Sequence, residues 1–154
     1  MSTLVGRELP QQMQTELDGR NLETKSNLGY LIVTVDEDGA PRPCMLSVGE
    51  ILVMDEHTIR LAVWPNSTTA ANLRRGSGVL LSYVAPNTVL YVRGHTLRTW
   101  QARVLAAEIG VDQVTTDEHP GFTVTDGIRF EYEGRSESLA TTWGRQLALL
   151  REVS

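Results

Sequence analysis

The residues whose types and spacing best suggest chemistry lie just after an apolar strand. Asn66 is followed by Ser67, Thr68 and Thr69, and Asn72 stands one turn beyond Thr68. A short helix that opens with hydroxyl residues presents free backbone N–H groups to an anion. The segment therefore predicts a phosphate-bearing ligand. The simpler alternative is that the hydroxyls cap the helix, which is worth ~1 kcal/mol, and that Asn72 satisfies backbone groups.

The other reactive residue types form no recognisable catalytic or metal-binding set. Cys44 is the single cysteine, so an intrachain disulfide is excluded, and no histidine or asparagine accompanies it in a nucleophilic pairing. His57, His95 and His119 have no metal-ligand spacing among themselves or with Cys44. We expect no metal site, and the catalytic residues are unknown.

Composition narrows the class of protein. The 154 residues suffice for one domain, with 41% hydrophobic and 21% charged residues. The net charge of −5, with scattered basic residues, argues against nucleic-acid binding. No stretch approaches the ~20 apolar residues needed to span a bilayer, so no membrane association is expected. The first residues lack the apolar core of a secretory signal, which predicts a cytoplasmic protein.

Periodicity predicts a mainly β protein with short helices. Strands are expected at 30–35, 42–48, 51–54, 59–63, 79–84, 89–97 and 127–134, and helices at 9–17, 67–75 and 137–152. The region 99–109 fits either a helix or a continued strand. Six or more strands with short connections indicate a closed or nearly closed antiparallel barrel. Strict alternation of helix and strand is absent, which excludes a doubly wound sheet.

Individual residues refine these elements. Strand 30–35 is apolar at almost every position and is expected to be buried on both faces. Pro41 and Pro43 place the start of the next strand at a sheet edge or a bulge. Apolar stripes are expected on the first and last helices, comprising Leu9, Met13 and Leu17, and Leu139, Trp143, Leu147 and Leu150.

Three segments carry a resemblance to a known family. Leu31 to Pro43 resembles the opening of the pyridoxamine phosphate oxidase-like, FMN-binding split-barrel family. Leu61 to Arg75 is similar to that family's strand-then-helix segment, which usually contains Ser-x-Lys-x-x-Asn-Leu. Val89 to Gly94 is similar to a strand ending in glycine, and the resemblance covers about Leu22 to Gly94.

The resemblance implies a Greek-key split barrel that forms a homodimer and holds FMN in grooves between the two barrels. The whole of 1–154 would be one FMN-binding domain, with an N-terminal helix in 1–21, the barrel in 28–134 and a C-terminal helix in 137–152. A small barrel has little interior volume, so a flat tricyclic ring is expected at an interface rather than inside.

The resemblance also implies the cofactor-binding residues. The ring would lie along the strand with Arg42, Pro43, Cys44, Met45 and Ser47, and the phosphate segment would comprise Ala62, Val63, Trp64, Ser67, Thr68, Thr69 and Asn72. Small Ala62 permits close approach of a ligand, and Trp64 stacks on it or merely packs. The alternative for strand 42–48 is that it contacts no cofactor, and that its prolines reflect an edge position while Met45 packs in the core.

One departure from the family concerns the phosphate. Thr69 stands where the family has a lysine, and a phosphate dianion is normally held by charge-assisted hydrogen bonds. Compensation is available from Arg42, or from Arg74 or Arg75 of either subunit, together with the helix amides. The alternatives are weak FMN binding, a deazaflavin, or no cofactor.

The leading functional hypothesis is an FMN-dependent oxidoreductase acting on an unknown small molecule, with the flavin carrying the redox chemistry. Its partners would be a second copy of the chain and a small-molecule substrate or electron donor. The alternatives are a non-catalytic flavin- or haem-binding protein and a structural dimer that has lost its cofactor. Pyridoxine phosphate oxidase activity itself is not expected, because Arg145 and Arg151 lack the C-terminal histidine partner of that enzyme.

Overall fold

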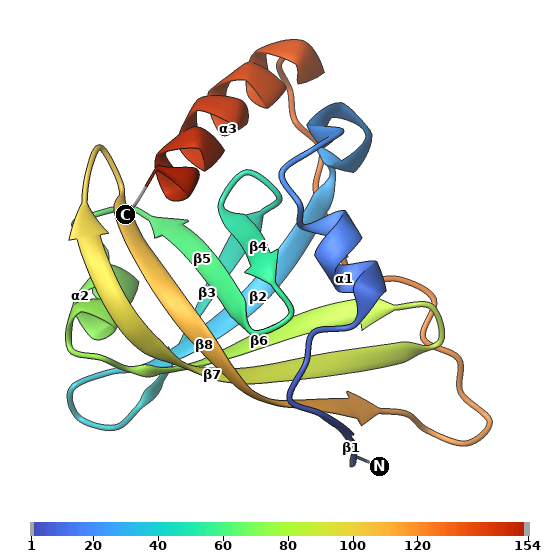
Figure 1. The fold of residues 1–154 in the computed structure, drawn as a ribbon. Coiled ribbons are helices and arrows are strands. Elements are labelled where there is room, and N and C mark those ends of the chain that lie inside the picture. Colours follow the sequence, from blue (N-terminus) through green and yellow to red (C-terminus); the bar gives the residue numbers. More distant parts are fainter. Residues whose placement is uncertain (1, 153–154) are drawn as a thin grey trace.

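One antiparallel sheet, coiled into an open barrel, forms most of the molecule. The computed structural model describes residues 2–152 (Figure 1). In this range the strands are β1 (Ser2–Gly6), β2 (Leu28–Val35), β3 (Pro41–Ser47), β4 (Ile51–Asp55), β5 (Thr58–Val63), β6 (Gly78–Ala85), β7 (Thr88–Gln101), β8 (Leu105–Asp117) and β9 (Ile128–Arg129). The helices are α1 (Gln11–Glu16), the short 3-10 helix η1 (Leu22–Lys25), α2 (Thr68–Arg74) and α3 (Ser136–Arg151). The predicted mainly β architecture with short connections is confirmed.

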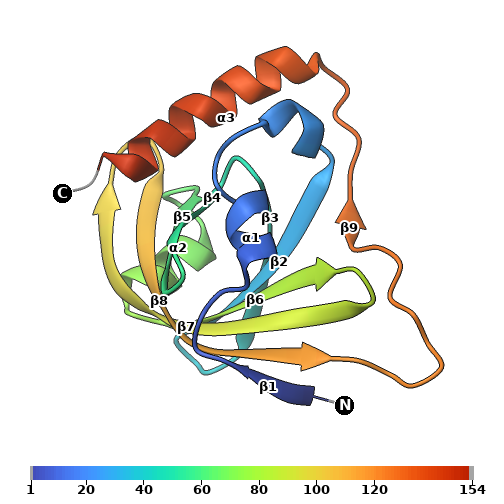
Figure 2. The same cartoon turned by 45° about the vertical axis from the view of Figure 1, so that its right-hand side comes forward.

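The strand order explains why the barrel is split. The main path of the sheet runs β3-β2-β6-β7-β8-β5-β4, with β1 added beside β8 and β9 beside β2. The strands β3 and β4 therefore end the path without pairing with each other. Helix α3 packs against η1, β4 and β5, and α1 packs against β4, so both helices cover the same end of the barrel (Figure 2). No helix within residues 2–152 is long and apolar enough to cross a bilayer.

The interior of the barrel is filled by alternate residues of its strands. Ile32, Leu61 and Leu81 are all nearly or fully buried, and they face one another with residues of β7 and β8. The free volume left among these side chains is about 10 Å³, which is less than a bound water needs. A ligand the size of a flavin ring is therefore excluded from the interior, as the sequence predicts.

The strand 30–35 is buried on one face, so the expectation of burial on both faces is wrong. Tyr30, Ile32 and Thr34 point into the barrel and are buried, whereas Leu31, Val33 and Val35 are half-buried or exposed. The outward residues are equally apolar, but no element within residues 2–152 forms a second layer over them. Apolar composition alone does not reveal whether a covering layer is present in the same chain.

One open alternative is resolved, and two further expectations about elements needed correction. The region 99–109, which fits either a helix or a continued strand, is the end of β7, a tight turn and the start of β8. The strand expected at 127–134 is reduced to Ile128–Arg129, because β6 takes the edge of β2 from Leu31 onward and leaves only two residues to pair. Within the expected N-terminal helix region, Ser2–Gly6 is a strand paired with β8.

The predicted apolar stripes are mostly buried. Leu9, Met13 and Leu17 are all buried, although only Met13 lies within α1. On α3, Trp143, Leu147 and Leu150 are buried and Leu139 is half-buried. These side chains close the end of the barrel, where a fully apolar cluster stabilises the fold by ~1.5–3 kcal/mol for each large buried side chain.

A buried arginine fixes the C-terminal end of α3 to the sheet. Arg60 donates from Nη1 to the Leu150 carbonyl oxygen at 2.6 Å, and from Nε and Nη2 to Glu108 Oε1 at 3.1 and 3.0 Å. Hydrogen bonds from Arg98 and then Arg60 hold the pKa of Glu108 below its usual range. Both guanidinium groups lie 5.5 Å from the centre of the Trp100 ring, a distance that allows a cation–π contact.

We expect the substitution Arg60→Ala to lower the free energy of unfolding by about 3 kcal/mol, because it leaves a buried carbonyl and part of the Glu108 charge without a donor. Urea unfolding followed by circular dichroism measures this. The matched control is Arg103→Ala in the exposed β7–β8 turn, which should change stability by less than ~0.5 kcal/mol. Equal effects of the two substitutions would contradict this account of Arg60.

Candidate functional site

The N-terminus of α2 faces the β2–β3 turn across an open hollow. The hollow has a volume of about 510 Å³. Asp36, Glu37 and Asp38 line one side, and residues of α2 and the loop before it line the other. Three carboxylates thus lie opposite the end of the helix that carries its free N–H groups.

Ser67 acts as the N-cap of α2. Its Oγ accepts a hydrogen bond from Ala70 N at 3.0 Å and donates one to the Trp64 carbonyl oxygen at 2.7 Å. Thr68 and Thr69 follow as the first helical residues, and their N–H groups have no carbonyl one turn earlier to pair with. The Thr68 side chain is exposed and Thr69 is only 4% exposed, so Thr68 is the hydroxyl that faces the hollow.

Asn72 is a fully buried link between α2 and the sheet. Its Nδ2 donates to Thr34 Oγ1 at 3.0 Å and to Asp36 Oδ1 at 2.8 Å, and its Oδ1 accepts from Arg75 Nη2 at 2.5 Å. The amide group thus has partners on both its nitrogen and its oxygen. The geometry agrees with the structural interpretation of Asn72, and a contact with a cofactor stays a prediction.

Asp36 accepts hydrogen bonds from two other residues beside the hollow. Arg42 donates to it from Nε and Nη2, the shortest distance being 2.7 Å, and Asn72 donates to it as well. Hydrogen bonds from Arg42 and then Asn72 hold the pKa of Asp36 below its usual range. All three arginines that the sequence proposes as phosphate partners already donate to protein acceptors: Arg42 to Asp36, Arg74 to the Pro65 carbonyl and Gln101, and Arg75 to Asn72.

Strand β3 is a sheet edge, as its prolines predict. It pairs with β2 along its whole length, and no strand among residues 2–152 pairs with its other side. Pro43 is exposed, Cys44 is half-buried, and Met45 is 53% exposed. The alternative interpretation that Met45 packs in the core is wrong, because Met45 lies on the outward side of the strand beside Leu31.

The turn after β3 carries a half-buried carboxylate, Glu50, that sequence reasoning missed. Ser47 donates from its N–H and its hydroxyl to Glu50 Oε1 at 2.9 and 2.7 Å, and burial raises the pKa of Glu50. The Trp143 ring covers Gly49 within this turn so closely that a side chain at position 49 would collide with it. A serine three residues before a glutamate is a spacing at which the glutamate side chain can accept from the serine N–H, and this spacing was the available signal.

Cys44 lies on the inward side of β3, toward α2. Burial raises the pKa of its thiol, and a hydrogen bond with Thr69 lowers it by a smaller amount. The thiol is protonated at neutral pH, which agrees with the absence of a nucleophilic role in the sequence interpretation.

The segment before α2 divides between core and surface. Ala62 and Val63 are buried side chains of β5, whereas Trp64 is 75% exposed. Of these three predicted site residues, the fold brings the side chain of Trp64 to the surface, near the start of α2.

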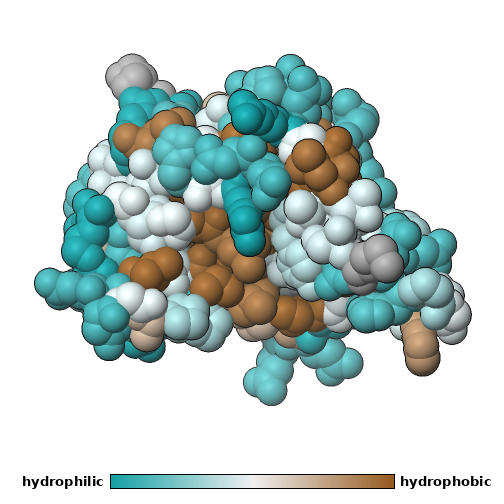
Figure 3. All heavy atoms as spheres, turned by 90° about the horizontal axis from the view of Figure 1, so that it is seen from below, coloured by the Kyte–Doolittle hydropathy of each residue, from teal (hydrophilic) through white to brown (hydrophobic). Residues whose placement is uncertain are grey.

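An apolar surface, which we call the outer face, lies on the outward side of β2, β3 and β6. Apolar side chains gather in the middle of the underside of the molecule, between polar margins (Figure 3). The outer face comprises Leu31, Val33, Val35, Pro43, Met45, Leu80 and Val84. Val33, Val35 and Leu80 also line an open hollow of about 510 Å³, bordered by Arg93, Asp112 and Gln113. Exposed apolar areas of this kind mark interaction surfaces.

Comparison with known proteins identifies the fold. No family model matches the chain. The uncharacterized protein YclD of Bacillus subtilis (strain 168) is 42% identical over 59 residues, and this match spans 38% of the present chain and 38% of that curated relative.

Solved structures match over more of the chain. A candidate pyridoxamine 5'-phosphate oxidase from Lactobacillus delbrueckii superimposes with a TM-score of 0.54 and 21% identity over 74% of this chain and 98% of that one. An F420 reductase superimposes with a TM-score of 0.52 and 13% identity, over 69% of this chain and 98% of that one. An FMN-binding protein from Syntrophomonas wolfei superimposes with a TM-score of 0.50 and 15% identity, over 68% of this chain and 88% of that one. At these identities it is the fold that is shared.

We expect a fall in pH to lower the stability of the protein through protonation of Asp36. A carboxyl whose pKa is lower in the folded state than in the unfolded state stabilises the protein at any pH above its unfolded-state pKa of about 4. This contribution to stability is lost as the pH falls through the folded-state pKa. The melting temperature of the wild type should therefore fall below pH ~4 more steeply than that of Asp36→Asn, which should already melt lower at neutral pH. Glu37→Gln, an exposed neighbour, is the matched control, and identical pH profiles for Asp36→Asn and the wild type would contradict the role of Asp36.

Proposed function

The chain has the split-barrel fold of pyridoxamine phosphate oxidase-like proteins, and from that premise we propose that it binds FMN at the junction of two copies and acts as a flavin-dependent oxidoreductase on a small molecule. The observation that carries this proposal is the open edge of β3 beside the N-terminus of α2, next to a barrel with only about 10 Å³ of free interior volume. Any binding of a flat ring must then use the outside.

The residues present fit the ring of a flavin. The unpaired edge of β3 offers backbone donors and acceptors to ring nitrogens and oxygens, which is how a protein orients a flavin and tunes it. Trp64 and Met45 are exposed next to this region and provide apolar contact. When bound, the flavin supplies the hydride or electron transfer, and the chain supplies orientation and exclusion of water.

The phosphate end fits less completely. The free N–H groups of Thr68 and Thr69 suit an anion, yet Asp36, Glu37 and Asp38 face the same hollow. Phosphate binding would require Arg42 to turn from Asp36, or cations from a second copy. We therefore propose weaker and more salt-sensitive FMN binding than a lysine at position 69 would give.

Homodimerisation follows from the outer face. Its apolar residues on three adjacent strands would be covered by the same face of a second copy, in the isologous manner of most dimers. The edge of β3 would then lie at the margin of the interface, where a ring is enclosed from both sides.

A structural dimer without a cofactor is the second candidate, and the carboxylates opposite α2 favour it. A deazaflavin cofactor remains an alternative within the enzyme class, since an F420 reductase is among the proteins of similar fold. FMN titration separates the structural dimer from the flavoprotein, because a ligand that binds the folded state must raise the melting temperature.

The central experiment is the visible spectrum of the purified protein, followed by FMN titration of the apoprotein. A flavin band at ~450 nm and a saturable rise in melting temperature are expected. Thr68→Asp should weaken FMN binding roughly tenfold, since it adds a negative charge at the start of α2. Thr142→Asp, exposed on α3, is the matched control and should have no effect. A colourless protein whose melting temperature does not change with added FMN would overturn the proposal.

Disruption of the outer face should separate the two copies. Leu80→Asp places a charge in the centre of the apolar surface, and desolvating it in an interface costs several kcal/mol. The molar mass measured by light scattering after gel filtration should fall from twice the chain mass of 17.1 kDa to that of a single chain. Phe122→Asp, which changes an exposed apolar residue outside the outer face, should leave the mass unchanged. A monomeric wild type would refute the dimer.

A further inference from the structure

A cavity, the wedge, opens where β2 and β6 part. The two strands pair only through Leu31–Val33, and β9 takes the place of β6 beside Leu28 and Gly29. Helix α1 closes the inner side of the gap, and the segment 125–129 lies across it. The wedge has a volume of about 360 Å³, which is within the range of small-molecule sites. It lies on the opposite side of β2 from β3.

The inner end of the wedge is polar. Tyr30 Oη donates to Glu16 Oε2 at 2.7 Å. The Tyr83 ring stacks on Tyr30 with centroids 6.2 Å apart. The Tyr83 hydroxyl does not line the wedge; it is fully buried and makes no hydrogen bond within residues 2–152.

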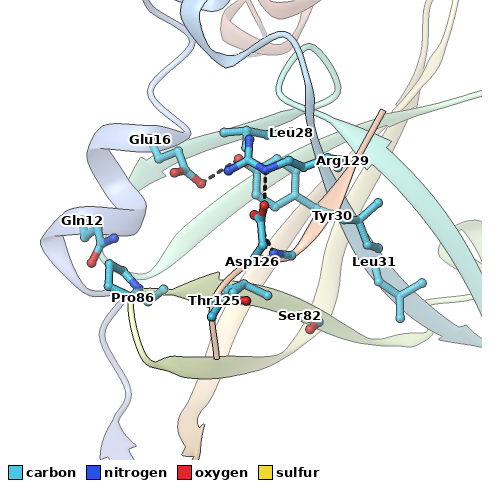
Figure 4. A pocket seen from close by; sticks show the side chains of 15 residues that line it. Gln12, Glu16, Leu28, Tyr30, Leu31, Ser82, Pro86, Thr125, Asp126 and Arg129 are labelled. Atoms are coloured by element: carbon cyan, nitrogen blue, oxygen red, sulfur yellow. Dashed lines mark hydrogen bonds and ion pairs between the residues drawn. The ribbon is translucent and has the colours of Figure 1, made fainter. Parts of the chain in front are cut away.

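The charges in the wedge favour a cation. Arg129 Nε pairs with Asp126 Oδ2 at 2.6 Å, and Gly127 N donates to the other oxygen of Asp126 at 2.9 Å. Glu16 and Arg129 point toward one another above Tyr30 (Figure 4). The hydrogen bond that Glu16 accepts among the described residues comes from the neutral Tyr30 hydroxyl. Two carboxylates therefore face one guanidinium, and the Glu16 charge is the one without a direct ion pair.

We propose that the wedge binds a small organic amine with a short apolar body. The ammonium donates to Glu16, which gives this carboxylate a cationic partner. The body lies along the apolar wall formed by Leu31, Val84 and Ile128. A carboxylate ligand of the same shape would meet Glu16 as a like charge and is rejected. The wedge is separate from the edge of β3, and its apolar wall shares Leu31 and Val84 with the outer face.

Three probes of one chain length test this on the full-length protein: hexylamine, hexan-1-ol and hexanoate. Amide chemical shifts in ¹⁵N-labelled protein should move saturably with hexylamine at Gln12, Gly29 and Gly127. Hexan-1-ol should bind at least ~10-fold more weakly and hexanoate should not bind, because only the amine forms a charge-assisted bond with Glu16. Glu16→Gln should weaken hexylamine binding by ~10-fold while its oxygen still accepts from Tyr30.

The controls make each outcome decisive. Tyr83→Phe removes a buried hydroxyl that does not line the wedge and should leave hexylamine binding unchanged. Glu23→Gln, an exposed carboxylate on η1, should bind hexylamine as the wild type does. Equal binding of hexanoate, unchanged affinity in the Glu16→Gln variant, or no response of the wild type to hexylamine would each overturn the proposal.

Discussion

The filled interior of the barrel is the constraint on which the rest of the molecule depends. Only about 10 Å³ is free among the side chains inside, so the places where a ligand fits are set by how the sheet ends and splits. The path of the sheet ends at β3 and at β4, and a gap opens between β2 and β6. The two candidate sites lie at the edge of β3 and at this gap, and β2 lies beside both.

Several residues that attract attention as chemical groups are used by the fold itself. Ser67 caps α2, and Asn72 joins that helix to Thr34 and Asp36. The carboxylate of Asp36 in turn holds Arg42. These bonds fix α2 against β2 and β3, and its first N–H groups are left without partners in the helix. A helix positioned in this way is preorganised for an anion, although the acidic turn opposite reduces the attraction.

The sequence reveals local pattern well and long-range pairing poorly. The burial of Leu9, Met13 and Leu17 follows from the pattern of a single segment, and it is borne out. The strand expected at 127–134 failed because its length depends on how much of β2 is left by β6. Met45 was assigned to the core in one interpretation because an apolar residue does not indicate which side of an edge strand it occupies.

The candidate site was predictable only in part for the same reason. The hydroxyls of α2 and the edge position of β3 follow from nearby residues. The approach of Asp36, Glu37 and Asp38 to α2 and the unpaired Tyr83 hydroxyl depend on contacts between distant segments. No spacing in the sequence specifies these contacts.

The closure of Gly49 by the Trp143 ring has a consequence for how this sequence can diverge. Even a methyl group at position 49 would occupy the space of the indole, while Gln146 Nε2 donates to the Gly49 carbonyl at 2.7 Å from the same helix. The two positions can therefore change only together: a larger residue in the turn demands a smaller one on α3. Relatives that keep the indole are expected to keep the glycine, so this pair is a marker for the docking of the last helix in an alignment.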